Sequence, residues 1–194
     1  MSLFKTTYPK LNDEELMVQS AHGDKQAFSE LYKRYADRLN CYFSSMFRFD
    51  KLKANDFTHD LFLKIIEYGR SYDKTKKFST WIFTIAANMC KNEFRRLEHE
   101  RSYHENEISP STVHHDYTED YIDFKIATHE LKSLLNELSS ESRELIFLRF
   151  HEELTIREIA EIKMLPEGTV KSRLFYTLKE ITTKMACYNI KIQQ

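Results

Sequence analysis

Residues 155–173 read TIREIAEIKMLPEGTVKSR, and this stretch decides the class of fold. Thr155 followed by Glu158 is the capping-box pattern that begins a helix. A turn around Pro166 separates that helix from a second one, and the small Ala160 falls where two crossing helices would approach each other. The stretch therefore has the proportions of a helix-turn-helix, although an αα-hairpin in any helical bundle is an alternative that fits the same pattern.

The second helix of this motif carries donors that suit DNA. Lys171, Ser172 and Arg173 lie in its first turns, where recognition helices meet base edges. Over residues 163–184, five basic residues stand against two acidic ones, a net charge of +3. We therefore expect duplex DNA binding here, with a solvated basic face as the alternative.

The rest of the chain also has the pattern of helices. The 194 residues contain only three Gly and three Pro, so tight hairpins and glycine-rich loops are few. Apolar residues recur at steps of three or four, which is typical of amphipathic helices. These steps predict helices over 12–22, 25–47, about 53–68, 79–96, 122–138 and 140–150. Polar caps are expected at Asn12 and Asp13, at Ser79 or Thr80, and at Ser139 or Ser140. Asn55 and Asp56 are expected near the start of the third helix.

An acidic segment separates two helical regions. Residues 97–130 contain nine acidic and two basic residues, a net charge of −7, and apolar residues are sparse until Ile122. Such a segment cannot bury enough surface to fold alone. We therefore predict an all-α fold of two small helical domains joined by a flexible acidic linker. The expected boundaries are a helical extension over 1–24, a first domain over 25–96, the linker over 97–125 and a second domain over 126–188.

The first domain ends in a second basic stretch. Residues 70–96 hold seven basic and two acidic residues, a net charge of +5. Aromatic rings alternate with these bases, and cations beside rings are what a single-strand binding surface needs. The alternative is that the rings belong to the core. The rings in question are Tyr72, Phe78, Trp81, Phe83 and Phe94.

Several other classes of protein do not fit the sequence. No phosphate-binding glycine loop or nucleophile elbow is present, and no apolar run reaches the ~20 residues of a membrane span. The three cysteines are far apart and are expected to be reduced thiols. A cluster of potential metal ligands lies in the linker, where a solvated acidic segment is the competing interpretation: His114, His115, Asp116, Glu119 and Asp120. We expect a cytoplasmic protein that is not an enzyme and needs no metal or cofactor.

Three motifs resemble one known family. Residues 55–65, NDFTHDLFLKI, and 78–88, FSTWIFTIAAN, resemble region 2 of the bacterial extracytoplasmic-function (ECF) sigma factors. Residues 135–181, with EIA at 158–160 and GTVKSR at 168–173, are similar to region 4 of the same family. The motifs follow the order and spacing of the family between Ala27 and Ile181. Two positions depart from the family pattern, where His59 replaces a frequent Gln and Tyr176 a frequent Arg.

The resemblance implies partners and roles for particular residues. In such factors, the helix that corresponds to 56–68 docks on the coiled-coil clamp of the largest polymerase subunit, and the residues on or near that surface would be Asp56, Asp60, Phe62 and Lys64. Region 2 captures and melts −10 DNA, for which we expect Tyr72, Lys76, Lys77, Trp81, Asn88 and Arg95. Region 4 reads the −35 element through Lys171, Ser172, Phe175 and Tyr176, with Arg173 on phosphate or on intramolecular contacts.

The family also implies further partners. The acidic linker would thread the basic RNA-exit region of the polymerase, the flap of the second subunit would bind the chain, and a separate anti-sigma factor would cover both basic surfaces. The expected function is promoter-specific initiation with core RNA polymerase, without membrane insertion. The alternative is a helix-turn-helix regulator that binds operator DNA without polymerase. A metal-dependent helical enzyme that uses the linker cluster is a third, remote alternative.

Overall fold

The computed structural model describes residues 8–104 and 129–192, which form helices and turns and no strand. The first region contains α1 (Asp13–Ala21), α2 (Lys25–Met46), α3 (Lys51–Tyr68) and α4 (Phe78–His104), with the short 3-10 turns η1 (Tyr8–Lys10) and η2 (Gly69–Ser71). The second region contains α5 (His129–Glu137), α6 (Ser140–Ile146), the π-helical segment η3 (Phe147–His151), α7 (Ile156–Lys163) and α8 (Glu167–Ile192). The all-α fold with a two-part architecture is thus confirmed.

Local capping explains where most helices begin. Asn12 and Glu15 form a reciprocal capping box at α1, and Thr155 and Glu158 form another at α7. Ser139 caps α6 by accepting a hydrogen bond from the Ser142 N–H. These three starts agree with the caps expected from sequence.

Two other helices begin elsewhere than predicted. The α3 helix begins at Lys51, because Asp50 accepts a hydrogen bond from the Lys53 N–H, so Asn55 and Asp56 lie inside the helix. The α4 helix begins at Phe78, and the predicted caps Ser79 and Thr80 are therefore wrong.

The start of α4 is instead stabilised from outside that helix. The Phe78 N–H donates a hydrogen bond of 2.9 Å to Oε1 of Glu14 on α1. A carboxylate at a helix N-terminus also meets the positive end of the helix dipole. A contact between residues this far apart in sequence has no local signature.

The N-terminal extension is part of the first core. Leu16 and Met17 on α1 are fully buried, and α1 packs along α2. Gly69 of η2 also lies against α1, where an added Cβ atom would fall 2.6 Å from Cε of Met17 and this side chain would have to shift. The segment expected as an extension over 1–24 therefore contributes directly to the helical core of the first region.

The last turns of α4 run into the segment expected as linker. The helix continues past Arg96 to His104. Arg96 bonds Glu93 three residues before it and Glu100 four residues after it, the spacings at which side chains meet on a helix surface. The rest of the expected linker, the metal-ligand cluster at 114–120 and the apolar positions Ile122 and Ile126 lie outside the described residues.

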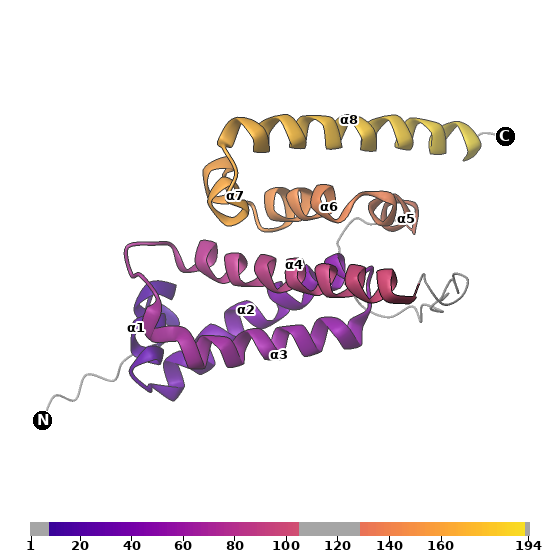
Figure 1. Cartoon of the computed structure of the whole chain (residues 1–194). Coiled ribbons are helices and arrows are strands. Elements are labelled where there is room, and N and C mark those ends of the chain that lie inside the picture. The colour runs from indigo at the N-terminus through magenta and orange to yellow at the C-terminus, as the bar shows by residue number, and fades with distance from the viewer. Residues whose placement is uncertain (1–7, 105–128, 193–194) are drawn as a thin grey trace, which may run out of the picture.

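The two regions pack against each other. In Figure 1, α4 runs across the middle of the molecule, with α2 and α3 on one side of it and α5–α8 on the other. The α4 helix contacts α7, and α2 contacts α6. Phe147 and Leu148 of the second region are buried, and they join the apolar cluster that contains Tyr42 and Phe83 of the first. We call this contact of α2 and α4 with α6, η3 and α7 the seam.

Candidate nucleic-acid interface

The loop between η2 and α4 is a tight, ordered turn. Asp73 accepts hydrogen bonds from the N–H and the hydroxyl of Thr75, and these bonds lower the pKa of its carboxyl. The Lys76 N–H donates to the carbonyl of Asp73 at 3.0 Å. The Tyr72 hydroxyl donates to the carbonyl of Lys76 and closes the loop from the other side. The loop therefore presents its lysines from a fixed backbone.

The aromatic rings beside this loop are shared between core and surface. Phe78 is fully buried, while Tyr72 and Trp81 are partly exposed. The Tyr72 ring lies 5.1 Å from the Trp81 ring in a tilted arrangement. Burial is the main cause that raises the pKa of Tyr72 to about 12, so this hydroxyl stays protonated at neutral pH. Of the two interpretations of these rings, core packing applies to Phe78 and Phe83. Phe94 is partly exposed and packs against Phe47, and Tyr72 and Trp81 retain a surface edge.

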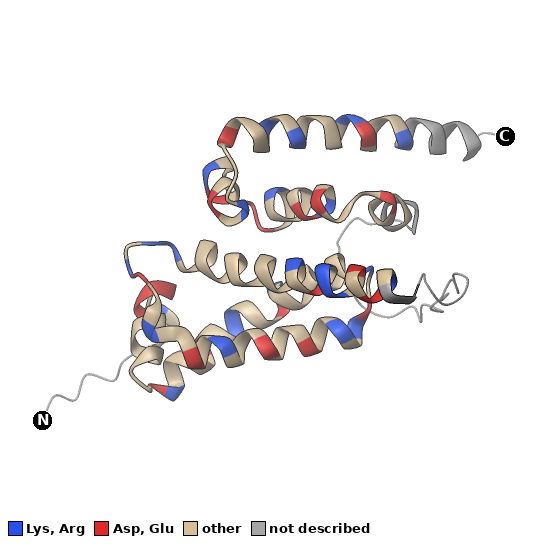
Figure 2. Cartoon of the chain, in the orientation of Figure 1, with Lys and Arg blue, Asp and Glu red and all other residues tan. Residues whose placement is uncertain are grey.

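Two of the three lysines of this loop, Lys76 and Lys77, already have acidic partners in the second region. Nζ of Lys77 lies 2.7 Å from Oε1 of Glu158, and Nζ of Lys76 lies 3.6 Å from Oε1 of Glu161. Both glutamates belong to α7. Figure 2 shows basic residues on the loop before α4 and acidic residues on the neighbouring α7. The residues expected to meet phosphate are therefore turned toward carboxylates.

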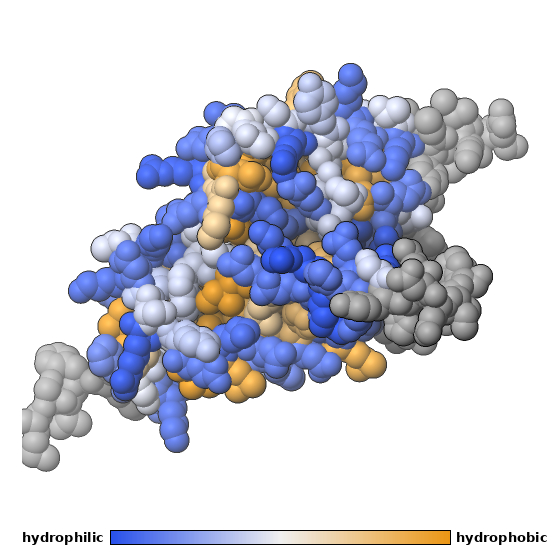
Figure 3. All heavy atoms as spheres, in the orientation of Figure 1, coloured by the Kyte–Doolittle hydropathy of each residue, from blue (hydrophilic) through white to orange (hydrophobic). Residues whose placement is uncertain are grey.

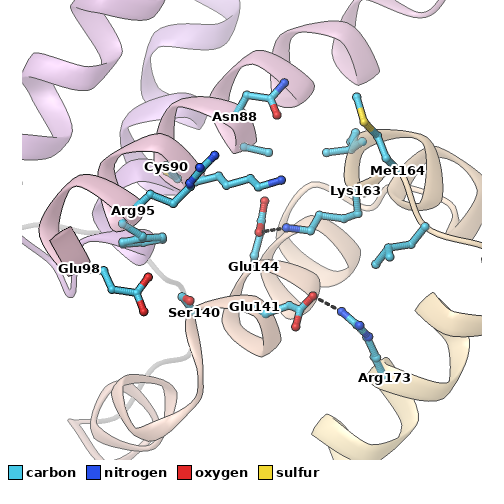
Figure 4. A pocket seen from close by; sticks show the side chains of 15 residues that line it. Asn88, Cys90, Arg95, Glu98, Ser140, Glu141, Glu144, Lys163, Met164 and Arg173 are labelled. Carbon is cyan, nitrogen blue, oxygen red and sulfur yellow. Dashed lines mark hydrogen bonds and ion pairs between the residues drawn. The ribbon is translucent and has the colours of Figure 1, made fainter. Parts of the chain in front are cut away.

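Two more of the predicted −10 residues line a groove at the seam. Asn88 and Arg95 are exposed on one face of α4, and they border a groove of about 550 Å³ between α4 and the second region. Arg173, predicted for the −35 site, lines the same groove and pairs with Glu141 (Figure 4). The structure thus brings together residues that the sequence assigned to two separate DNA contacts.

The helix-turn-helix forms as expected. Ile159 and Val170 are fully buried and Ala160 is 8 % exposed, and Met164 adopts a left-handed conformation in the turn. The remaining four residues predicted for the −35 site are exposed at the start of α8: Lys171, Ser172, Phe175 and Tyr176. The Ser172 hydroxyl donates to the carbonyl of Gly168, while the two rings stand 63 % and 67 % exposed. Two exposed neighbouring aromatic rings can contact thymine methyl groups in a major groove.

The third predicted surface lies on α3. Asp56, Asp60 and Lys64 are exposed there. Phe62 is only 3 % exposed and packs against the rings of Phe28 and Tyr32, so it supports this face from beneath.

The α3 surface is more apolar than the sequence suggested. Ile66 and Tyr68 continue the apolar spacing of this helix, but they are 62 % and 59 % exposed, because the neighbouring Ile65 fills the core. Leu63 is 56 % exposed beside them. Figure 3 shows hydrophobic atoms along the lower edge of the molecule, in the area where α3 lies in Figure 1. An apolar helix face of this kind indicates a protein partner.

Sequence reasoning missed the polar residues of the seam. Tyr42 on α2 is fully buried and donates a hydrogen bond of 2.7 Å to Glu144 on α6, which also bonds Lys163 (Figure 4). Arg38 on α2 donates to Glu152, whose side chain is 1 % exposed. Their partners lie 102 and 114 positions away, so no spacing pattern could have connected them. A charged residue within a buried helical stripe was the only available signal.

None of the described helices is both long and apolar enough to cross a bilayer. Within residues 8–104 and 129–192, no group of three or more His, Cys, Asp and Glu side chains is arranged to hold a metal ion.

Comparison with known families finds two matches, in the order of the two regions. The sigma-70 region 2 model matches residues 31–100, and the sigma-70 region 4 model matches residues 128–181. Together these matches cover most of the described residues. The first contains the loop lysines and the α3 surface, and the second contains the helix-turn-helix.

Curated relatives match along most of the chain. The ECF RNA polymerase sigma factor SigW of Bacillus subtilis is 26 % identical over 167 residues, which cover 80 % of this chain and 87 % of SigW. The ECF RNA polymerase sigma-E factor of Haemophilus influenzae is 26 % identical over 185 residues, which cover 91 % of this chain and 96 % of that protein.

Solved structures share the fold. The sigma factor RpoE from Bartonella quintana, bound to the anti-sigma factor NepR, matches with a TM-score of 0.66 and 22 % identity over 82 % of this chain and 96 % of RpoE. CnrH, bound to the cytosolic domain of CnrY, matches with a TM-score of 0.64 and 21 % identity over 90 % of this chain and 97 % of CnrH.

Proposed function

The chain belongs to the ECF branch of the sigma-70 family, and from this premise we propose that it binds core RNA polymerase and directs transcription initiation at promoters with specific −35 and −10 elements. The observation that carries the proposal is the pair of family matches over residues 31–100 and 128–181, in the order that sigma factors use. A helix-turn-helix regulator would need only the second of these matches, which favours the sigma factor over that alternative.

Each surface described above is assigned to one partner in this proposal. The exposed face of α3, with Asp56, Asp60 and Lys64 above the buried Phe62, docks on the coiled-coil clamp of the largest polymerase subunit. The apolar side chains of Leu63 and Ile66 extend this surface and supply the area that a stable protein contact needs. The C-terminal region of the chain binds the flap of the second polymerase subunit.

DNA contacts come from the two basic surfaces. Region 4 reads duplex −35 DNA through the exposed side chains at the start of α8: Lys171, Ser172, Phe175 and Tyr176. Arg173 pairs with Glu141 and so joins α8 to α6 within region 4, and it also contacts a DNA phosphate. Domain limits of 25–96 and 126–188 are proposed for the two regions, with α1 integrated into the first.

Region 2 holds the separated −10 strand. The partly exposed rings of Tyr72 and Trp81 provide stacking edges for an unpaired base, and the base would gain about 1–3 kcal/mol from stacking. The phosphates of this strand meet Lys76, Lys77 and Arg95, while Asn88 donates hydrogen bonds from the exposed face of α4. The chain breaks no covalent bond in this mechanism, because binding free energy alone opens the duplex; it is not an enzyme.

Location and regulation follow from this role. A chain that works with RNA polymerase acts in the cytoplasm. An anti-sigma factor is the proposed regulator, since a solved sigma factor of similar fold is bound to one.

In vitro transcription tests the proposal. Core RNA polymerase with the full chain should produce transcripts with defined 5′ ends on genomic DNA fragments, whereas core polymerase alone should not. Asp60→Lys should lower both capture of core polymerase and transcript yield about tenfold, the effect of a like-charge contact at an interface. Asp37→Lys, an equal charge change on the exposed face of α2, is the matched control and should change neither. Absence of promoter-specific transcripts with the unchanged chain would refute the proposed function.

A further inference from the structure

Three of the polar contacts between the two regions hold the seam through buried side chains. The first is made by Arg143 of α6, which is 3 % exposed. Its guanidinium donates to the carbonyl of Ser45 at 3.0 Å and to that of Met46 at 3.5 Å, at the C-terminal end of α2. A cation at this end of a helix satisfies carbonyls that lack partners within the helix, and it meets the negative end of the helix dipole.

The other two contacts join α2 to buried carboxylates. Nε of Arg38 lies 2.9 Å from Oε2 of Glu152, and the Tyr42 hydroxyl lies 2.7 Å from Oε1 of Glu144. The seam also contains rings, since Phe147 packs edge-on against Tyr42 at 5.5 Å. A contact with so many buried charged groups can separate without leaving a purely apolar face in water, because each charge is hydrated when the regions part.

The same arrangement pairs lysines of one DNA surface with carboxylates. Glu158 and Glu161 project from α7 onto Lys77 and Lys76, so two carboxylates occupy the lysines that would otherwise meet phosphates. Asn88 and Arg95 border the groove at the seam and remain exposed. The acidic edge of α7 therefore takes the place of a single strand in this conformation.

Two other surfaces remain open in this conformation. Lys171 and Tyr176 are exposed at the start of α8, and the exposed face of α3 carries Asp60 and Leu63. In Figure 1, α3 and α8 lie at opposite sides of the molecule, and the seam is between them. Closure thus pairs two lysines of the surface for the −10 strand with carboxylates and leaves the surfaces proposed for the −35 duplex and the polymerase accessible.

We propose that the free chain is self-inhibited, with α7 acting as an internal acidic ligand of the loop lysines Lys76 and Lys77 and with the seam contacts of Arg38, Tyr42 and Arg143 holding it in place. This inference rests on the proposed function for its biological meaning, since it assigns a regulation to the same −10 surface. The closed chain docks on polymerase through α3, and separation of the regions on the polymerase exposes the loop to the melted strand.

Two charge reversals, one in each region, test whether the two regions close on each other. Arg38→Glu places a carboxylate against the buried Glu152 and should separate the regions. Glu161→Lys places a second cation beside Lys76 and should release the loop, and the side chain of Glu161 is 48 % exposed, so this change leaves the core intact. Lys33→Glu is the control for the first variant, because it makes a charge change of the same sign at an exposed position of α2.

The first readout is the shape of the full chain in solution. Small-angle X-ray scattering without DNA or polymerase should give a compact form for the unchanged chain and for Lys33→Glu. The radius of gyration should rise by several ångströms in Arg38→Glu, since the regions are then joined only through the chain between them. A radius for the unchanged chain equal to that of Arg38→Glu would overturn the proposal.

The second readout is affinity for a fluorescein-labelled oligothymidylate of about 12 nucleotides, measured by anisotropy at low salt. Arg38→Glu and Glu161→Lys should bind it about tenfold more tightly than the unchanged chain, which corresponds to an open fraction of about one tenth in the unchanged chain. Lys33→Glu should bind no more tightly. Replacing both Lys76 and Lys77 by Ala should abolish the gain in the Arg38→Glu background and change little in the unchanged chain.

The outcomes separate the two proposals. If neither charge reversal binds the oligonucleotide more tightly than the unchanged chain, self-inhibition is wrong. Neither readout uses polymerase, so a chain that initiates transcription but is extended in solution refutes only the closure. A compact chain that never supports initiation refutes only the proposed function.

Discussion

Removing one buried hydroxyl should reveal how strongly the two regions hold each other. Tyr42→Phe deletes the hydrogen bond to Glu144 and leaves the ring in place, so the edge-on contacts with Phe83 at 5.6 Å and Phe147 at 5.5 Å persist. Tyr42 is fully buried and Glu144 is 6 % exposed, so water does not replace the lost donor. The variant removes the polar contact of Tyr42 across the seam, together with the hydrogen bond between this hydroxyl and Cys90 on α4.

The expected cost is about 2 kcal/mol. Hydrogen bonds to charged groups contribute about 1.5–3 kcal/mol, and a buried carboxylate that loses a donor is destabilised by a similar amount. Lys163 continues to bond Glu144, which places the expected value in the lower half of that range. A loss of about 2 kcal/mol corresponds to a change of about thirtyfold in the equilibrium that the bond supports.

Urea unfolding followed by circular dichroism and by the fluorescence of Trp81 measures this loss. Tyr176→Phe is the control, because Tyr176 is 67 % exposed and its free energy of unfolding should change by no more than about 0.5 kcal/mol. A double-mutant cycle with Glu144→Gln should give a coupling energy of at least about 1 kcal/mol. If Tyr42→Phe is no less stable than Tyr176→Phe, the hydrogen bond across the seam does not form in solution and the reasoning fails.

Two further predictions concern pH and DNA. The pKa of His151 is raised to about 9, mainly by a hydrogen bond with Cys41 and secondly by one with Glu152. The charged form of His151 therefore stabilises the fold fully below about pH 6.5, and this contribution is lost as the pH rises through 9. The urea midpoint should therefore fall between pH 6.5 and 9, and His151→Gln should make this fall smaller; an equal fall in both proteins would contradict the assignment. Lys171→Ala should weaken binding of polymerase with this chain to −35 duplex DNA by about 1 kcal/mol and lower the salt slope by about 1. Lys179→Ala, exposed further along α8, is its control and should have the smaller effect in a filter-binding titration.

The helices could be predicted wherever their determinants are local. Asn12, Ser139 and Thr155 cap their helices through bonds to residues three positions away, and such bonds depend only on the neighbouring sequence. The start of α4 could not be predicted, because its cap is Glu14 on another helix. The exposure of Ile66 could not be predicted for a related reason, since periodicity alone cannot say which edge of a wide apolar stripe faces the core.

The candidate sites also contain some features that local sequence predicts and others that depend on distant contacts. Exposure of Lys171 at the start of α8 follows from the helix-turn-helix pattern, which needs only the turn and the buried Val170 beneath. The engagement of Lys77 by Glu158 could not be foreseen, because it joins residues 81 positions apart. Counting charges by segment indicated a basic loop but gave no means to identify the carboxylate nearest to it.

The sequence by itself determined the helices, the helix-turn-helix, the charge zones and the membership of a family, because each depends on short-range pairing or on motifs in a fixed order. Only the tertiary structure decided that the two regions close on each other through Arg143, Tyr42 and Arg38, and that glutamates of α7 pair with lysines of the loop before α4. The physical reason is that these contacts are selected by burial and charge complementarity between surfaces far apart in the chain. Their free energy depends on the shape of both surfaces and on the water they exclude, and neither property is encoded in the spacing of neighbouring residues.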